Sequence, residues 1–148
     1  MSKQDVGDNH RRKIVCWVLF VGYCGFIVWM TLLSRRASAR EYELGLFWGL
    51  RMWLYGEPQG WTVFVQYINN ILFFIPFGFL LDGIIDDKWK YVTAIAMVSS
   101  ALIELTQYIT ARGLLEVDDM ISNTVGAVIG CLLWTSGKRL VERYIDVC

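Results

Sequence analysis

The stretch SSALIELTQYITARGLLEVDDMISNTVGAVIG, residues 99–130, decides the fold of this chain. It consists of an apolar run, a short polar turn and a second apolar run, with acidic or amide side chains in each part. Ionisable side chains are costly inside a bilayer, so within an apolar segment they mark a functional site by default. We therefore interpret this stretch as a helical hairpin in a membrane, and the rest of the chain as the frame that holds it.

The composition of the whole chain is typical of a small membrane protein. Of its 148 residues 55% are hydrophobic, and the mean hydropathy of +0.42 is too high for an ordinary soluble domain. The 14 basic and 14 acidic residues balance, so no nucleic-acid partner is indicated. Because there are two prolines and no linker-like tract, we expect residues 1–148 to form a single domain.

Histidine and cysteine usage argues against several chemistries. His10 is the only histidine and lies in the polar N-terminal tail, and the four cysteines form no C-x-x-C pair. We therefore expect neither a histidine-based catalytic triad nor a zinc site, and no cofactor.

Four apolar runs are each long enough to cross a bilayer. A helix rises about 1.5 Å per residue, so about 20 residues span the hydrocarbon core. The sequence predicts transmembrane helices over residues 14–33, 62–85, 91–110 and 119–135. The expected fold is therefore all-α, an integral membrane bundle of four transmembrane helices.

The first loop contains a segment that is too broken to span the membrane. Residues 41–55 mix leucine, tryptophan and phenylalanine with Glu43 and Arg51. This mixture fits an interfacial or re-entrant segment whose aromatic rings lie at headgroup level. An ordinary covered loop fits the same pattern, and both alternatives stay open.

The distribution of basic residues predicts an orientation. Four spans place both termini on one side, and that side carries nine basic residues, namely Lys3, Arg11, Arg12, Lys13, Lys88, Lys90, Lys138, Arg139 and Arg143. The opposite side carries five, namely Arg35, Arg36, Arg40, Arg51 and Arg112. Since cytoplasmic loops are enriched in lysine and arginine, we predict a multi-pass protein of the cell membrane with both termini in the cytoplasm.

Polar side chains of different spans are predicted to meet near the outer surface. Glu104 and Gln107 share one face of the third helix, and Asp119 and Asn123 share one face of the fourth. A short turn makes these helices antiparallel neighbours, and the Gly126-x-x-x-Gly130 motif allows close backbone packing below the polar groups. We expect an outward-open polar pocket on a tightly packed base.

The candidate catalytic residues are the acids Glu104, Asp118 and Asp119. The candidate ligand-binding residues carry guanidinium or amide groups at the same depth, and they are Arg35, Asn70, Gln107, Arg112 and Asn123. Structural roles remain as alternatives: one of the two aspartates can cap a helix N-terminus, Glu104 can pair with an arginine, and Asn70 can hydrogen-bond to a neighbouring helix.

Two separate motifs resemble those of the VanZ-like family. Residues 69–81, NNILFFIPFGFLL, resemble its N-I-L-L-F-I-P-F-G-F-L-L signature. Glu104-x-x-Gln107, Arg112, Asp118-Asp119 and Asn123-x-x-Gly126 resemble its E-x-x-Q, R and D-D-x-x-x-N-x-x-G block, in the same order. The resemblance extends over residues 14–135. It departs at Glu116, where the family often has aspartate, and at residues 43–47, where many members carry N-L-x-P-F.

The resemblance implies a small bacterial membrane protein. The founding member of the family is linked with low-level resistance to teicoplanin, a glycopeptide whose acyl chain allows an interaction at the membrane. The partners that the resemblance implies are membrane lipids and an amphiphilic or lipid-linked ligand.

Several functions are compatible with these residues. A binding or shielding protein would use Arg35 and Arg112 to hold phosphate or carboxylate groups of an envelope molecule or lipoglycopeptide. An enzyme acting on a lipid or lipid-linked phosphate would use Glu104 as acid or base. Only in that case would Asp118 and Asp119 hold a metal ion, such as Mg²⁺. A transporter would need a homo-oligomer, because four helices leave little room for a path. A purely structural polar network is the remaining alternative.

Overall fold

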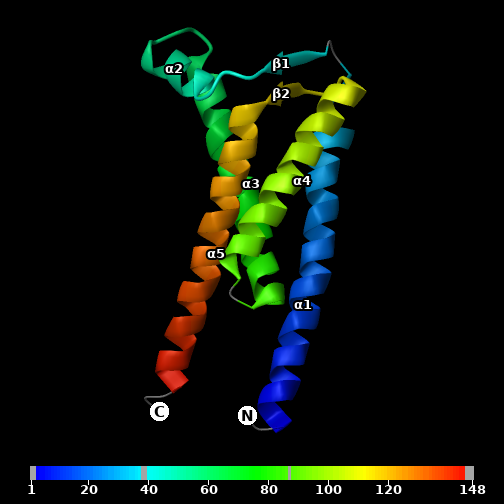
Figure 1. Ribbon diagram of the computed structural model, residues 1–148, viewed down its shortest axis with the longest axis vertical. Helices are drawn as coiled ribbons and strands as arrows, with labels where there is room; N and C mark the ends of the chain where they lie inside the picture. The colour runs from blue at the N-terminus through cyan, green and yellow to red at the C-terminus, as the bar shows by residue number, and fades with distance from the viewer. Residues whose placement is uncertain (1–2, 38–39, 87, 146–148) are drawn as a thin grey trace.

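The computed structural model describes residues 3–37, 40–86 and 88–145. Long helices lie side by side along most of its length (Figure 1). In chain order the elements are α1 (Lys3–Val28), the π-helical turn η1 (Trp29–Leu33), β1 (Glu41–Glu43), α2 (Trp48–Leu54), α3 (Gly60–Ile85), α4 (Trp89–Thr110), β2 (Leu114–Glu116) and α5 (Val117–Ile145).

The prediction of an all-α bundle with four membrane-crossing helices is confirmed. The segments that are long and apolar enough to cross a membrane are Asn9–Leu33, Gly60–Ile85, Trp89–Thr110 and Val117–Val141. The helix α1 begins before the predicted span and α5 continues past it, because polar residues outside the apolar runs extend both helices. Apolar side chains on the outer surface, such as Val18 at 67% and Leu132 at 60% exposure, face where lipid would lie.

The two ends of the bundle differ. Both termini lie at one end, which we call the terminal end, and β1, α2 and β2 lie at the other, which we call the loop end (Figure 1). At the terminal end, Arg12 donates a hydrogen bond of 2.9 Å to Asp86, and Lys13 also pairs with Asp86. Asp82 is fully buried nearby in α3 and accepts a hydrogen bond from Thr135 of α5 at 3.4 Å. The sequence did not single out Asp82.

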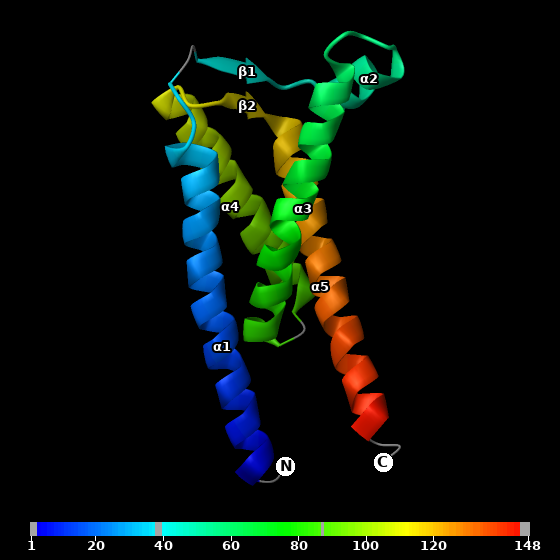
Figure 2. The same ribbon diagram turned by 180° about the vertical axis from the view of Figure 1, so that it is seen from behind.

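The centre of the bundle is a seam between α3 and α5, where backbone lies against backbone. Figure 2 shows α3 between α1 and α5. A Cβ atom at Gly78 would lie 2.0 Å from the carbonyl oxygen of Ala127, and one at Gly130 would lie 2.0 Å from that of Ile75. Only glycine permits these approaches, since any side chain would push the helices apart. The predicted glycine packing is present, and its partner is α3.

The first loop contributes structure that the sequence did not predict. β1 and β2 form a parallel pair in which Glu41 lies opposite Leu114 and Glu43 opposite Glu116. The following helix α2 packs on α3, where the rings of Trp53 and Phe64 stack with their centroids 4.3 Å apart. Because Tyr55 at the end of α2 is 80% exposed, the loop has one covered face and one exposed face.

Candidate functional site

Four acidic side chains are buried at the loop end of the bundle, and all four lie within a short stretch of the sequence. Glu104 is 3% exposed, Glu116 4%, Asp118 3% and Asp119 5%. They come from α4, β2 and the first turn of α5, so the hairpin of residues 99–130 carries all of them. A buried carboxylate requires hydrogen-bond donors or a positive charge, so the partners of these four groups define what the site can do.

Glu104, Glu116 and Asp119 belong to one hydrogen-bonded network. The backbone N–H of Glu116 donates to Oε2 of Glu104 at 2.9 Å. The amide of Gln66 on α3 donates to Oε1 of Glu116 at 3.4 Å and to Oδ2 of Asp119 at 3.3 Å. Gln66 therefore joins β2 and α5 to α3 through two acidic side chains.

Asp118 has a different set of partners from its neighbour. Its Oδ1 accepts the backbone N–H of Phe47 at 2.7 Å, its Oδ2 accepts that of Trp48 at 3.0 Å, and the hydroxyl of Tyr67 also donates to it. Phe47 precedes α2 with φ of 54°, a left-handed conformation that is uncommon for an aromatic residue. Asp118 thus caps the N-terminus of α2 rather than that of its own helix.

Gln107 and Arg112 hold the end of α1. The amide of Gln107 donates to the carbonyl oxygen of Thr31 at 3.1 Å, and Nη1 of Arg112 donates to that of Leu32 at 2.9 Å. Both carbonyls belong to the π-helical turn η1, and such wide turns occur often at functional sites. This π-helical turn has no recognisable signal in the sequence.

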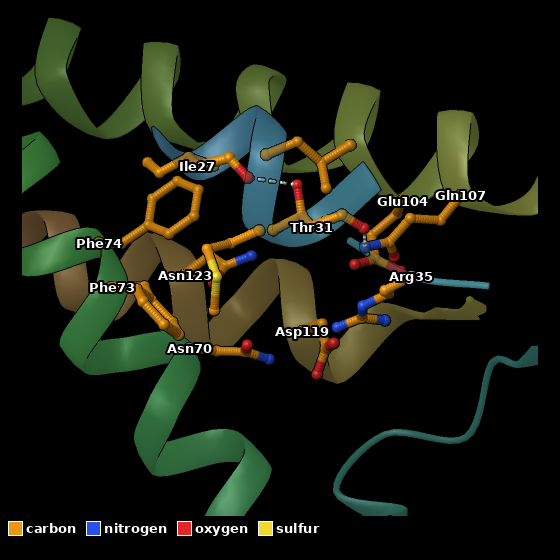
Figure 3. A pocket seen from close by; sticks show the side chains of 12 residues that line it. Ile27, Thr31, Arg35, Asn70, Phe73, Phe74, Glu104, Gln107, Asp119 and Asn123 are labelled. Carbon is orange, nitrogen blue, oxygen red and sulfur yellow. Dashed lines mark hydrogen bonds between the residues drawn. The ribbon is translucent and has the colours of Figure 1, made fainter. Parts of the chain in front are cut away.

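A cavity of about 30 Å³ lies between α1, α3, α4 and α5 close to the loop end (Figure 3). Its polar lining consists of Thr31, Arg35, Asn70, Glu104, Gln107, Asp119 and Asn123. Six of these seven are sequence-predicted site residues, and Thr31 is the addition. The predicted residues Asp118 and Arg112 are not among the residues that line the cavity.

The polar groups around the cavity are fixed by contacts between helices. Asn123 on α5 donates to the hydroxyl of Ser100 on α4 at 2.8 Å, and both residues are buried. Arg35 is exposed, and its positive charge acts on both Glu104 and Asp119. Figure 3 shows its guanidinium beside these acids. The cavity therefore has a buried acidic wall and a basic group at its edge.

Glu116 carries a strongly perturbed carboxyl group outside the membrane-crossing helices. Burial, and next the negative charge of Asp119, raise the pKa of Glu116 to about 7, while the hydrogen bond from Gln66 opposes the rise. Among the described residues, no three His, Cys, Asp or Glu side chains are grouped so that they could hold a metal ion. In the first turn of α5, Asp118 and Asp119 point to different partners and therefore do not form part of such a metal-binding group.

Two members of the network, Gln66 and Glu116, were not among the predicted site residues. Gln66 precedes Asn70 by one helical turn on the same face of α3, and this spacing is the signal that points to it. Glu116 is a third acid in the turn that ends with Asp118 and Asp119. The pairing of β1 with β2, which places Glu116, has no signal in the sequence.

Four apolar helices with buried acidic groups near one end define a small multi-pass membrane protein with a polar site inside its helical bundle. A family model described as VanZ/LLP1 matches residues 20–140, and the chain belongs to this family. The predicted family membership is therefore confirmed.

The chain is also similar to a curated relative. It is 34% identical over 85 residues to Protein VanZ of Enterococcus faecium, an alignment that covers 56% of this chain and 53% of that protein. The match thus spans about half the length of this relative. No solved structure matches the chain.

Proposed function

We propose that this VanZ-like membrane protein uses the cavity at its loop end to engage an amphiphilic molecule of the cell envelope or a lipoglycopeptide, and thereby contributes to resistance of the teicoplanin type. The cavity is the observation that carries the proposal. It gathers Glu104 of α4, Asp119 of α5 and Arg35, which lies in the bend after η1. Ionisable groups inside a membrane are costly and mark a functional site by default.

The position of the cavity fits an amphiphilic ligand. It lies close to the loop end of the bundle, so a headgroup can enter it while an acyl chain stays beside the apolar helices. Arg35 supplies donors for a phosphate or carboxylate group, and Asn70 adds an amide. If both termini lie in the cytoplasm, the cavity is on the outer side, where a lipoglycopeptide arrives.

A second candidate function is an enzyme that acts on a lipid or a lipid-linked phosphate. The observation that favours it is the carboxyl group of Glu104, which is buried, lines the cavity and is oriented by the backbone N–H of Glu116. In this role Glu104 transfers a proton as acid or base. Turnover of an added lipid by the wild type, and its loss in Glu104→Gln, would favour the enzyme over the binding protein.

Teicoplanin susceptibility tests the proposed function. A susceptible Gram-positive host expresses the wild type, Glu104→Gln or Asp86→Asn at matched membrane abundance. We expect the wild type to lower susceptibility and Glu104→Gln to lose the effect, because the substitution replaces a carboxyl group of the cavity wall with an amide. Asp86→Asn is the matched control, since this carboxylate lies at the terminal end and pairs with Arg12.

Two results would contradict the proposal. If the wild type leaves susceptibility unchanged, the protein has no resistance role. If Glu104→Gln protects the host as well as the wild type does, the cavity is not the site of the effect and Glu104 has a structural role.

A further inference from the structure

The cavity contains two polar atoms that the protein leaves without partners. Oδ1 of Asp119 accepts no hydrogen bond from the described residues, and Nδ2 of Asn70 donates none to them. The amide of Asn70 points toward Asp119 in Figure 3, but its Nδ2 donates no hydrogen bond of accepted length and angle to that carboxylate. Asp119 is only 5% exposed, and a buried carboxylate oxygen normally has a donor. The cavity thus offers an occupant one free acceptor and one free donor.

The charges around these atoms are arranged in order of depth. Glu104 and Asp119 are buried in the wall, whereas Arg35 is exposed at the edge. The lining therefore contains two carboxyl groups and one guanidinium group. An occupant with a positive group inside and a negative group outside would match this arrangement.

The size of the cavity restricts the positive group. A volume of about 30 Å³ is enough for a few water-sized groups. A primary ammonium is about as large as a water molecule and offers three N–H donors, one of which can reach Oδ1 of Asp119. A trimethylated ammonium is larger and has no N–H donor, so it would leave Asp119 unsatisfied.

We propose that the cavity binds the aminoalkyl phosphate headgroup of a membrane lipid, with its primary ammonium against Asp119 and Glu104 and its phosphate against Arg35 and Asn70. This inference rests on the proposed function and names the chemistry of the ligand. A lipid with a phosphate alone would bring a negative charge against the acidic wall. An amine without an anion would meet the positive charge of Arg35 first.

Binding of short-chain phospholipids to the purified full-length protein in detergent tests the inference. Dihexanoyl phosphatidylethanolamine is compared with the phosphatidylcholine and phosphatidylglycerol of the same chain length, and dissociation constants are measured by calorimetric titration. We expect the ethanolamine lipid to bind about tenfold more tightly than either of the others, because only it satisfies both subsites. Equal binding of the three lipids would overturn the inference.

Variants assign the two subsites. Asp119→Asn keeps the shape of the side chain, and we expect it to abolish the preference for ethanolamine over glycerol headgroups. Arg35→Gln changes an exposed residue at the edge of the cavity, so it tests the phosphate subsite, and we expect it to weaken binding of both lipids. Asp86→Asn at the terminal end should bind as the wild type does. An unchanged preference in Asp119→Asn would overturn the assignment.

Further arms separate this inference from the proposed function and from other sources of the headgroup. Free O-phosphoethanolamine that bound as tightly as the lipid would overturn the membrane lipid as the source. If resistance depends on Glu104 but the protein shows no preference among lipids, the headgroup inference is overturned and the proposed function stands. A clear preference for ethanolamine, in a protein that leaves teicoplanin susceptibility unchanged, would support the headgroup and contradict the resistance role.

Discussion

At the scale of single residues, the adjacent acids Asp118 and Asp119 illustrate how one helical turn divides two tasks. Consecutive side chains of a helix point in directions about 100° apart, so adjacent residues face different neighbours. Asp118 turns to the N-terminus of α2, and Asp119 turns to the cavity. Asp118 is therefore a helix cap, and Asp119 is a residue of the cavity.

The cap gives a prediction for Asp118→Asn. The amide has one acceptor oxygen in place of two, so one N–H of Phe47 or Trp48 loses its partner. We expect α2 to open more readily by about 1–3 kcal/mol, measured as faster hydrogen exchange of the amides of residues 47–54. Exchange in α2 that stays at the wild-type rate would contradict the cap.

The carboxyl group of Glu116 gives a prediction for pH dependence. Its pKa of about 7 in the folded protein lies above its ordinary value of 4.5, so the folded state holds a proton that the unfolded state has lost. The folded state binds more protons in this window, and therefore stability should fall as the pH rises from about 4.5 through about 7 and should not fall further on account of Glu116. Melting temperatures in detergent check this sign.

Glu116→Gln is the matching variant for the pH series. Glutamine cannot titrate, so we expect a weaker decrease of the melting temperature between pH 5 and pH 7.5 than in the wild type, a window that brackets the pKa of about 7. If wild type and variant lose stability in parallel, other groups account for the pH dependence.

At this scale the sequence predicted which polar residues lie at the site better than it predicted which groups they contact. The cost of ionisable groups in apolar segments pointed to Glu104 and Asp119, and both line the cavity. Arg112 was expected to hold a ligand or to pair with Glu104, but it donates to the carbonyl of Leu32. That carbonyl is available because of the π-helical turn η1, which depends on tertiary packing and not on local sequence preference.

At the scale of elements, the seam of α3 and α5 sets the distance across which the polar groups meet. Cβ atoms at Gly78, Gly126 and Gly130 would each lie 2.0–2.2 Å from a carbonyl oxygen of the facing helix. The hydrophobic effect does not drive helices together once they are inside a membrane. They associate instead through van der Waals packing of this close kind. The seam thus supports Gln66 and Asn70 on α3 against Asp119 on α5.

Gly130→Ala tests the seam. The new methyl group would lie 2.0 Å from the carbonyl oxygen of Ile75, so the helices must separate, and we expect a loss of about 1–3 kcal/mol in stability or failure to accumulate. Gly137→Ala lies on the same helix with nothing within 4 Å and is the matched control. Alanine should be tolerated there, because it favours helix more than glycine does.

Thermal unfolding of both variants in the same detergent provides the measurement. Equal melting temperatures for Gly130→Ala and Gly137→Ala would show that α3 and α5 do not depend on backbone contact at this position.

At the scale of the whole molecule, the four apolar runs predicted the number of long helices, and their even number agrees with the two termini at one end (Figure 1). Hydropathy succeeds here because a spanning helix satisfies its own backbone groups. The parallel pairing of β1 with β2 escaped prediction, since three-residue strands far apart in sequence have no period to detect. The cavity likewise depends on how the whole bundle is assembled.

The orientation in the membrane remains a prediction of the basic-residue distribution. In a background without native cysteines, Tyr55→Cys at the exposed end of α2 should react with a membrane-impermeant maleimide applied to intact cells. Lys88→Cys, in the exposed turn before α4, should react only after the cells are opened. The reverse pattern of labelling would place the loop end in the cytoplasm and would exclude direct access of an external ligand to the cavity.

The central claim is that the cavity at the loop end engages an amphiphilic ligand such as a lipoglycopeptide, and direct binding of teicoplanin tests it most sharply. The full-length protein is placed in nanodiscs of phosphatidylglycerol, and binding is measured for the wild type, Glu104→Gln and Asp86→Asn. We predict saturable binding that Asp86→Asn retains and that Glu104→Gln weakens about tenfold or more. Binding that is absent from the wild type, or equal in all three proteins, would contradict this account.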